Sequence, residues 1–231
     1  MNQLAEQLHN VQNMVADAAK TANRTPDSVR LLAVSKTFPA EDVLTAYTAG
    51  QKEFGENRVQ ELEQKVPALP GDIVWHLIGH LQSNKAAKAA ELADWVHSVD
   101  SVKLVNKLSD AAGKCGKTLK ILLEVNVSGE ESKYGIRSEE TLFQVAEAAA
   151  NAPSIEWKGL MTMAPADASP EELQKVFAGL RNLRDSLEQK YSVSLPELSM
   201  GMSGDYQAAI AEGATIVRIG TAIFGGRDYS K

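Results

Sequence analysis

The chain has 231 residues, of which 44% are hydrophobic, so it is long enough for one large core or two small domains. Its formal net charge of -6 argues against a nucleic-acid-binding surface, which needs clustered lysine and arginine to neutralise phosphates. Cys115 is the only cysteine, which excludes an internal disulfide and a thiolate zinc cluster. The sequence shows neither a leader-like start nor an apolar run of ~20 residues. We therefore expect a cytoplasmic protein that binds neither nucleic acid nor membrane.

Apolar periodicity divides the chain into alternating strands and helices. The first 21 residues carry apolar side chains at helical spacing and predict an amphipathic helix ahead of the first strand. The predicted strands come from residues 29–37, with Lys36 just past the strand end, and from 52–55, 73–79, 95–99, 119–127, 155–163, 197–200 and 215–219. The predicted helices between them span 40–49, 56–66, 83–92, 102–113, 139–152, 170–190 and 204–212.

Residue types at the helix starts support this division. Ser138 is expected to cap one helix, Asp100 or Ser101 another, and Pro170 takes a first helical position. No linker or composition shift separates the repeating units. The sequence therefore predicts one α/β domain over 1–231, a single (β/α)8 TIM barrel with an extra N-terminal helix, and the alternative is an open doubly wound sheet.

Lys36 follows a continuous apolar run that is typical of a strand buried on both faces. Ligands of parallel α/β folds gather at the carboxyl ends of such strands, so Lys36 is placed to react with one. The alternative is a solvated lysine that opens a loop, because lysine is mostly exposed.

Two glycine-rich segments follow the last two strands, at 199–205 and 218–226. Barrels commonly bind phosphate there, because glycines let backbone N–H groups approach an anion. Ser203 and Thr221 add hydroxyl donors, and Gly204 and Gly220 leave room for the backbone. A phosphate opposite a lysine is the minimum for a pyridoxal phosphate site, but a Schiff-base aldolase for sugar phosphates uses the same two parts.

Six segments, in order along the chain, resemble the pyridoxal phosphate homeostasis proteins: 32–37, 54–61, 75–85, 125–133, 159–163 and 198–229. The resemblance implies a barrel like the N-terminal domain of alanine racemase, with pyridoxal phosphate held as a Schiff base on Lys36. It further implies that the phosphate is held by Ser203, Gly204, Gly220 and Thr221, that Arg218 faces the pyridine nitrogen, and that Asn57 and Met200 line the ring. Since a guanidinium stays protonated, it donates to that nitrogen without giving up its proton, and the ring becomes a weak electron sink.

The expected function is therefore intracellular pyridoxal phosphate homeostasis, in which the protein buffers or delivers the cofactor and has no catalytic residue of its own. The rival is a pyridoxal phosphate-dependent amino-acid racemase, whose second base in alanine racemase comes from an additional domain across a dimer. Because the sequence ends a few residues after the last strand, we expect a monomer, with pyridoxal phosphate-dependent apoenzymes as possible recipients. The four histidines lack metal-ligand spacing, so we expect no metal; His76 and His97 are predicted to pack within strands, and His80 to border the cofactor.

Overall fold

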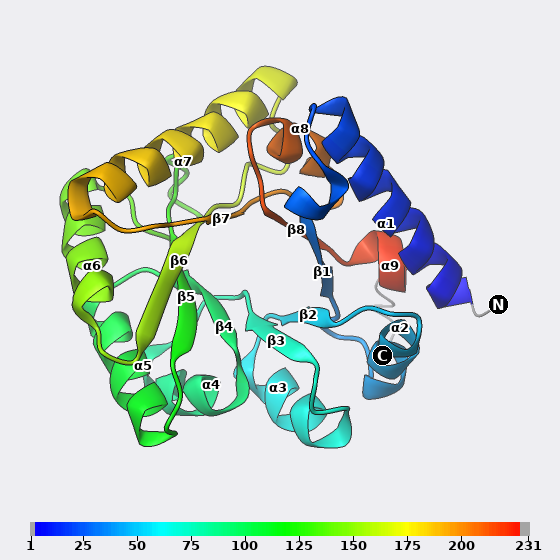
Figure 1. The fold of residues 1–231 in the computed structure, drawn as a ribbon, viewed down its shortest axis with the longest axis horizontal. Coiled ribbons are helices and arrows are strands. Elements are labelled where there is room, and N and C mark those ends of the chain that lie inside the picture. Colours follow the sequence, from blue (N-terminus) through cyan, green and yellow to red (C-terminus); the bar gives the residue numbers. More distant parts are fainter. Residues whose placement is uncertain (1–2, 227–231) are drawn as a thin grey trace.

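The computed structural model describes residues 3–226 and shows eight parallel strands that close into a barrel. The strands follow one another around the barrel in chain order, and helices surround them (Figure 1). The strands are β1 (Arg30–Val34), β2 (Glu53–Glu56), β3 (Val74–Leu77), β4 (Trp95–Val99), β5 (Leu119–Glu124), β6 (Ile155–Met161), β7 (Glu197–Ser199) and β8 (Ile216–Ile219). β1 pairs with β8 from Arg30↔Ile216 to Ala33↔Ile219, so the predicted barrel is confirmed and the open sheet is excluded.

The α-helices of the described residues are α1 (Gln3–Thr21), α2 (Ala40–Thr48), α3 (Val59–Lys65), α4 (Ala86–Leu92), α5 (Val102–Lys114), α6 (Glu139–Asn151), α7 (Pro170–Tyr191), α8 (Tyr206–Ala211) and α9 (Thr221–Phe224). Short 3-10 segments are η1 (Pro26–Ser28), η2 (Val66–Ala68) and η3 (Ser83–Lys85). The expected extra helix is α1, which contacts α2, α8 and α9 on the outside of the barrel (Figure 1). No helix among residues 3–226 combines the length and the hydrophobicity that a bilayer crossing requires.

The helix caps follow the sequence signals in part. Ser138 accepts a hydrogen bond from the backbone N–H of Thr141, and Ser169 forms a capping box with Glu172 ahead of Pro170. Ser101 occupies the cap position of α5, but its side chain makes no capping hydrogen bond.

Several element boundaries differ from the predictions by one to three residues, and one short helix was not predicted. The helix predicted to begin at Glu56 begins at Val59, because Glu56 is the last residue of β2 and its side chain is buried. β5 ends at Glu124, three residues earlier than predicted. The segment after β8 contains α9, which is too short to give a periodic signal.

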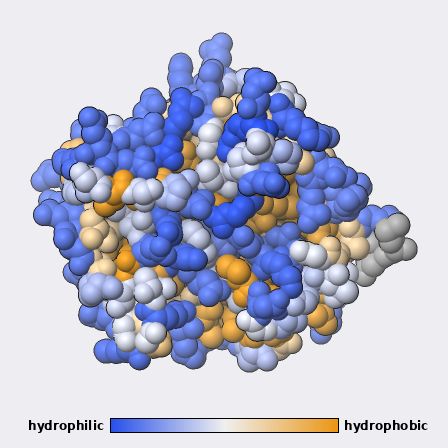
Figure 2. All heavy atoms as spheres, viewed as in Figure 1, coloured by the Kyte–Doolittle hydropathy of each residue, from blue (hydrophilic) through white to orange (hydrophobic). Residues whose placement is uncertain are grey.

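The main hydrophobic core lies between the barrel wall and the helices, where the buried faces of α1 to α8 meet the outward side chains of the strands. A second, small cluster of Trp95, Leu122 and Met161 lies apart from it. His76 and His97 are fully buried within β3 and β4, so the prediction that they pack in strands is confirmed. On the face of the molecule in Figure 2, hydrophilic side chains predominate and hydrophobic ones form small separate areas.

Candidate functional site

A cavity of about 470 Å³ opens at the carboxyl ends of the strands. Side chains that follow β1, β2 and β3 line one part of it, and the two glycine-rich segments after β7 and β8 line another. The structure brings together all but one of the predicted binding residues, namely Lys36, Asn57, Ser203, Gly204, Arg218, Gly220 and Thr221. His80, the residue expected at the border of the site, also lines the cavity.

Met200 is the exception. Its side chain is fully buried in the main hydrophobic core and does not line the cavity. The neighbouring Ser199 points into the barrel, where it contacts Arg218, and alternation along an extended segment sends the next side chain to the other face. Met202, two residues further on, lines the cavity instead.

The turn that carries Lys36 is held from several sides. The Ser35 hydroxyl donates to Glu56 Oε1 at 2.7 Å, and Lys65 Nζ donates to the Ser35 carbonyl at 2.9 Å. Thr37 has a left-handed φ of 70°, which a β-branched residue rarely adopts, and its N–H donates to Glu61 Oε1 at 2.7 Å. These contacts fix the backbone on both sides of Lys36 and keep it at the edge of the cavity.

Glu56 and Lys65 form a buried ion pair, with Lys65 Nζ 2.5 Å from Glu56 Oε1. Neither side chain is more than 6% exposed. Burial raises the pKa of Glu56 to about 7, although Lys65 and Ser35 act in the opposite direction. The pair therefore supports the lysine-bearing turn by means of a carboxyl group that titrates near neutral pH.

Two glycines allow the backbone to come close at the cavity edge. A Cβ on Gly220 would lie 2.8 Å from the Val34 carbonyl oxygen, and a Cβ on Gly79 would lie 2.3 Å from that of Asn57. In contrast, a Cβ on Gly204 would meet nothing within 4 Å. The close backbone approach therefore requires glycine at positions 220 and 79, whereas the space beside Gly204 is open to a ligand.

Arg218 extends from β8 into the barrel and is 4% exposed. Its Nη1 donates to Ser199 Oγ at 2.7 Å and its Nη2 donates to the Thr162 carbonyl at 2.9 Å. Burial lowers the pKa of Arg218 to about 10, while Asp205 and Glu124 act against that shift. The guanidinium is therefore a fixed cation at neutral pH and borders the cavity as a hydrogen-bond donor.

Sequence reasoning missed Glu124 and Tyr134, which also line the cavity. Glu124 is 3% exposed, and burial, with help from Asp100, raises its pKa to about 7. Tyr134 stacks on His80 with ring centroids 4.1 Å apart. A charged residue inside the apolar run of β5 was the signal for Glu124, whereas Tyr134 lies in a loop without periodicity. Among residues 3–226, no cluster of three or more His, Cys, Asp or Glu side chains could hold a metal ion.

Comparisons with known proteins agree with this geometry. The family model for the N-terminal domain of alanine racemase matches residues 7–228. A protein of Vibrio alginolyticus named pyridoxal phosphate homeostasis protein is 44% identical over the full length of both chains. This chain belongs to the pyridoxal phosphate homeostasis protein family. The family segment at 198–229 extends past residue 226, so its last residues lie outside the part that the structure describes.

Solved structures show the same relationship. PipY of Synechococcus elongatus PCC7942, solved with pyridoxal phosphate bound, is 41% identical, with a TM-score of 0.83 over 96% of this chain and 100% of that one. An alanine racemase of Bacillus anthracis is 17% identical, with a TM-score of 0.71 over 96% of this chain and 57% of the racemase. The second likeness shows a shared barrel fold and no more.

Proposed function

We propose that this protein binds pyridoxal 5'-phosphate as a Schiff base on Lys36 and serves in pyridoxal phosphate homeostasis, without turning over a substrate of its own. The observation that supports the proposal is the cavity, which is lined both by Lys36 and by two glycine-rich segments that carry hydroxyl donors. PipY, which was solved with pyridoxal phosphate bound, covers nearly the whole of this chain at 41% identity.

The donor set fits the group. Pyridoxal phosphate supplies an aldehyde that condenses with a lysine amine, and a phosphate that needs hydrogen-bond donors. Lys36 would hold the aldehyde carbon, and Ser203, Gly204, Gly220 and Thr221 would hold the phosphate. The open space at Gly204 leaves its backbone accessible to an anion. A volume of about 470 Å³ falls in the ordinary range for small-molecule sites.

Arg218 and Asn57 would contact the ring. Arg218 is anchored on Ser199 and Thr162, so it offers a donor to the pyridine nitrogen from a fixed position. Asn57 lines the cavity next to Gly79. Because the side chain of Met200 is buried behind this surface, we assign it no contact with the ring.

The proposal that no substrate is turned over rests on Arg218. With a pKa of about 10 it remains a cation, so it would donate a hydrogen bond to the ring nitrogen without protonating it, and the ring would be a weak electron sink. Loss of an α-proton from an amino acid is then poorly supported. In water enriched in deuterium, L-alanine should therefore show little exchange at its α-carbon and no racemisation beyond that of free pyridoxal phosphate.

Rapid α-proton exchange would contradict the carrier proposal and favour the racemase. His80, Glu124 and Tyr134 are the cavity groups that could then accept the proton, so His80→Gln, Glu124→Gln and Tyr134→Phe would identify the base. Binding itself is tested separately, by titrating the protein with pyridoxal phosphate and following the absorption band of the bound group. Saturable binding is expected in the wild type, and its absence would refute the proposal.

We further propose that the protein acts as a monomer in the cytoplasm and passes pyridoxal phosphate to dependent apoenzymes. The residues proposed to bind pyridoxal phosphate that line the cavity all belong to one chain. Light scattering should give the mass of one chain, 24.9 kDa. For delivery, the loaded protein should activate an apoenzyme faster than the same concentration of released pyridoxal phosphate does in the presence of an amine trap.

A further inference from the structure

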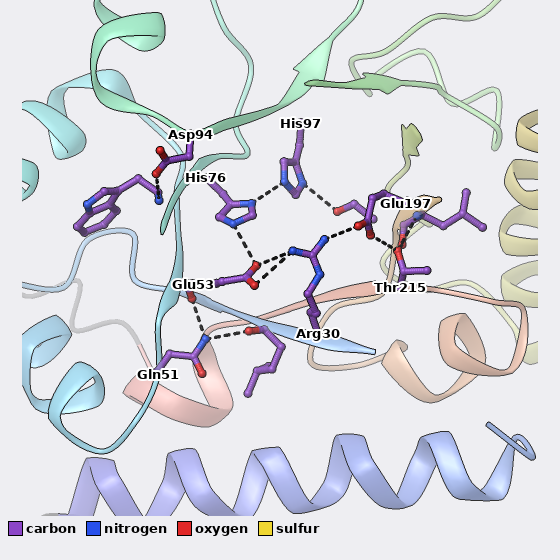
Figure 3. A network of polar contacts seen from close by, with 12 residues as sticks. Arg30, Gln51, Glu53, His76, Asp94, His97, Glu197 and Thr215 are labelled. Atoms are coloured by element: carbon purple, nitrogen blue, oxygen red, sulfur yellow. Dashed lines mark hydrogen bonds and ion pairs between the residues drawn. The ribbon is translucent and has the colours of Figure 1, made fainter. Parts of the chain in front are cut away.

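A row of polar side chains crosses the interior of the barrel and ends at Arg218. Figure 3 shows the part of this row that runs from Glu53 through His76 to His97. Arg218 Nη1 is 2.7 Å from Ser199 Oγ, which is 2.9 Å from His97 Nδ1. His97 Nε2 is 2.9 Å from His76 Nδ1, and His76 Nε2 is 3.2 Å from Glu53 Oε2.

The two ends of this row determine its direction. Arg218 has only donors, so Ser199 Oγ must accept from it. At the other end, burial would raise the pKa of Glu53, but His76 and Arg30 together hold it below its ordinary value. Glu53 is thus a carboxylate that can only accept, and Arg30 Nη1 binds it at 3.1 Å.

The groups between these ends must each accept on one side and donate on the other. The hydroxyl proton of Ser199, which is fully buried, has His97 Nδ1 as its acceptor. His97 then carries its proton on Nε2 and donates to His76 Nδ1, and His76 carries its proton on Nε2, facing Glu53. This last link is a contact at 3.2 Å that does not meet hydrogen-bond geometry, and His76 Nε2 has no hydrogen-bond partner among residues 3–226.

The opposite tautomers do not fit. If His97 carried its proton on Nδ1, His97 Nε2 would accept from His76 Nδ1, and the lone pair of His76 Nε2 would face the Glu53 carboxylate. Two acceptors would then oppose each other in a fully buried site. Double protonation is disfavoured as well, because burial lowers the pKa of both histidines, that of His97 well below its ordinary value.

We propose that His97 and His76 are positioning residues for Arg218. Both are neutral Nε2–H tautomers, and they connect Arg218 through Ser199 to the Glu53 carboxylate. This connection sets the position at which the guanidinium of Arg218 meets the bound pyridine ring. The inference rests on the proposed function for the role of Arg218, but the tautomers are a property of the protein alone. The packing suits a rigid connection, since His76 stacks on Trp95 with ring planes 8° apart. Arg30 also contacts Glu197 at 2.7 Å, which fixes the outer end of the row.

The first test is nitrogen NMR of the histidine rings in the 15N-labelled full chain without added ligand. The chain has only four histidines, and single substitutions of His9 and His80 would assign their signals without disturbing the row. At neutral pH, both His76 and His97 should show a protonated Nε2 and an unprotonated Nδ1. An Nδ1–H tautomer or a doubly protonated ring at either residue would overturn the proposal.

The second test measures pyridoxal phosphate binding in variants of the row. Ser199→Ala and His97→Leu interrupt it and should weaken affinity about tenfold and shift the absorption maximum of the bound group. His97→Gln keeps one acceptor and one donor and should restore affinity to within about threefold of the wild type. Ser109→Ala removes another buried hydroxyl, which accepts from Ser154 N far from the cavity, and should change neither quantity.

These outcomes separate the inference from the proposed function. Folded Ser199→Ala and His97→Leu proteins with wild-type affinity and spectrum would overturn the inference while leaving pyridoxal phosphate binding intact. A wild-type protein that fails to bind pyridoxal phosphate would instead refute the proposed function. If His97→Leu does not fold, Ser199→Ala and the NMR measurement still decide the matter.

Discussion

Lys65 and Glu56 meet in a buried ion pair directly beside the turn that carries Lys36. The same ammonium that lies 2.5 Å from Glu56 Oε1 also donates to the Ser35 carbonyl at 2.9 Å. The second oxygen of Glu56 is buried and has no hydrogen-bond partner among the described residues. The carboxylate at this site therefore depends on Lys65, and so does the backbone that precedes Lys36.

Replacing Lys65 by methionine should be strongly destabilising. A buried carboxylate that loses its cation typically costs ~3–5 kcal/mol, and the loss should be largest at pH 8, where Glu56 is ionised. The double variant Lys65→Met/Glu56→Gln should recover most of the lost unfolding free energy, since no charge remains buried at this site. Chemical denaturation of the three proteins measures this. Lys88→Met, in an exposed pair with Glu91, is the control and should match the wild type, whereas equal effects at positions 65 and 88 would contradict the account.

Gly220 and Gly204, two of the glycines that line the cavity, give a matched comparison. Gly220→Ala places a methyl group 2.8 Å from the Val34 carbonyl oxygen, so we expect a loss of about 1–3 kcal/mol in unfolding free energy. Gly204→Ala adds its methyl group in open space and should leave stability unchanged. Thermal unfolding of the two proteins distinguishes them. If both were equally stable, the close approach of β1 and the turn after β8 would not be as described.

The sequence predicted the barrel because its strands are continuous apolar runs separated by helices. It also predicted that Lys36 and the glycine-rich segments would meet, because the carboxyl ends of parallel strands share one end of a barrel. The family resemblance supplied the individual ligand contacts, and those contacts remain predictions.

Other features depend on contacts that no local pattern encodes. Glu56 was predicted to begin a helix, yet its ion pair with Lys65 makes a buried position at the end of β2 possible. The predicted strand at 119–127 continued past Glu124, so the sequence did not indicate that this carboxyl group lies at the strand end, where it lines the cavity. The strand positions of His76 and His97 were predictable, but their connection to Arg218 arises only when β3, β4, β7 and β8 surround the same interior.

The hydroxyl groups of the proposed phosphate site can be removed one at a time. Ser203→Ala and Thr221→Ala should each weaken pyridoxal phosphate binding about tenfold to a hundredfold, because a hydrogen bond to a charged group contributes ~1.5–3 kcal/mol. The fold should survive, since both side chains are exposed. Equilibrium titration gives the affinities, with Thr48→Ala on the outside of α2 as a control. Unchanged affinity in both variants would place the phosphate elsewhere.

Replacing Glu124 by glutamine should stabilise the protein, by an amount that depends on pH. Its pKa is about 7 in the folded protein and near 4.5 in the unfolded chain, so ionisation favours unfolding as pH rises between these values. Glu124→Gln should therefore match the wild type near pH 4.5 and exceed it above pH 7. The shift corresponds to at most ~3 kcal/mol, reduced by the lost attraction to Arg218. Urea denaturation at several pH values tests this, and a gain that shrinks as pH rises would contradict it.

The most direct test of the central claim is to locate the lysine that binds pyridoxal phosphate. The full chain is incubated with pyridoxal phosphate, reduced with borohydride, digested and mapped by mass spectrometry, in parallel with Lys36→Met. We predict one stoichiometric adduct, on Lys36, which is absent from the variant. A stoichiometric adduct on any other lysine of the wild-type protein, or unchanged labelling of Lys36→Met, would contradict the assignment of the site.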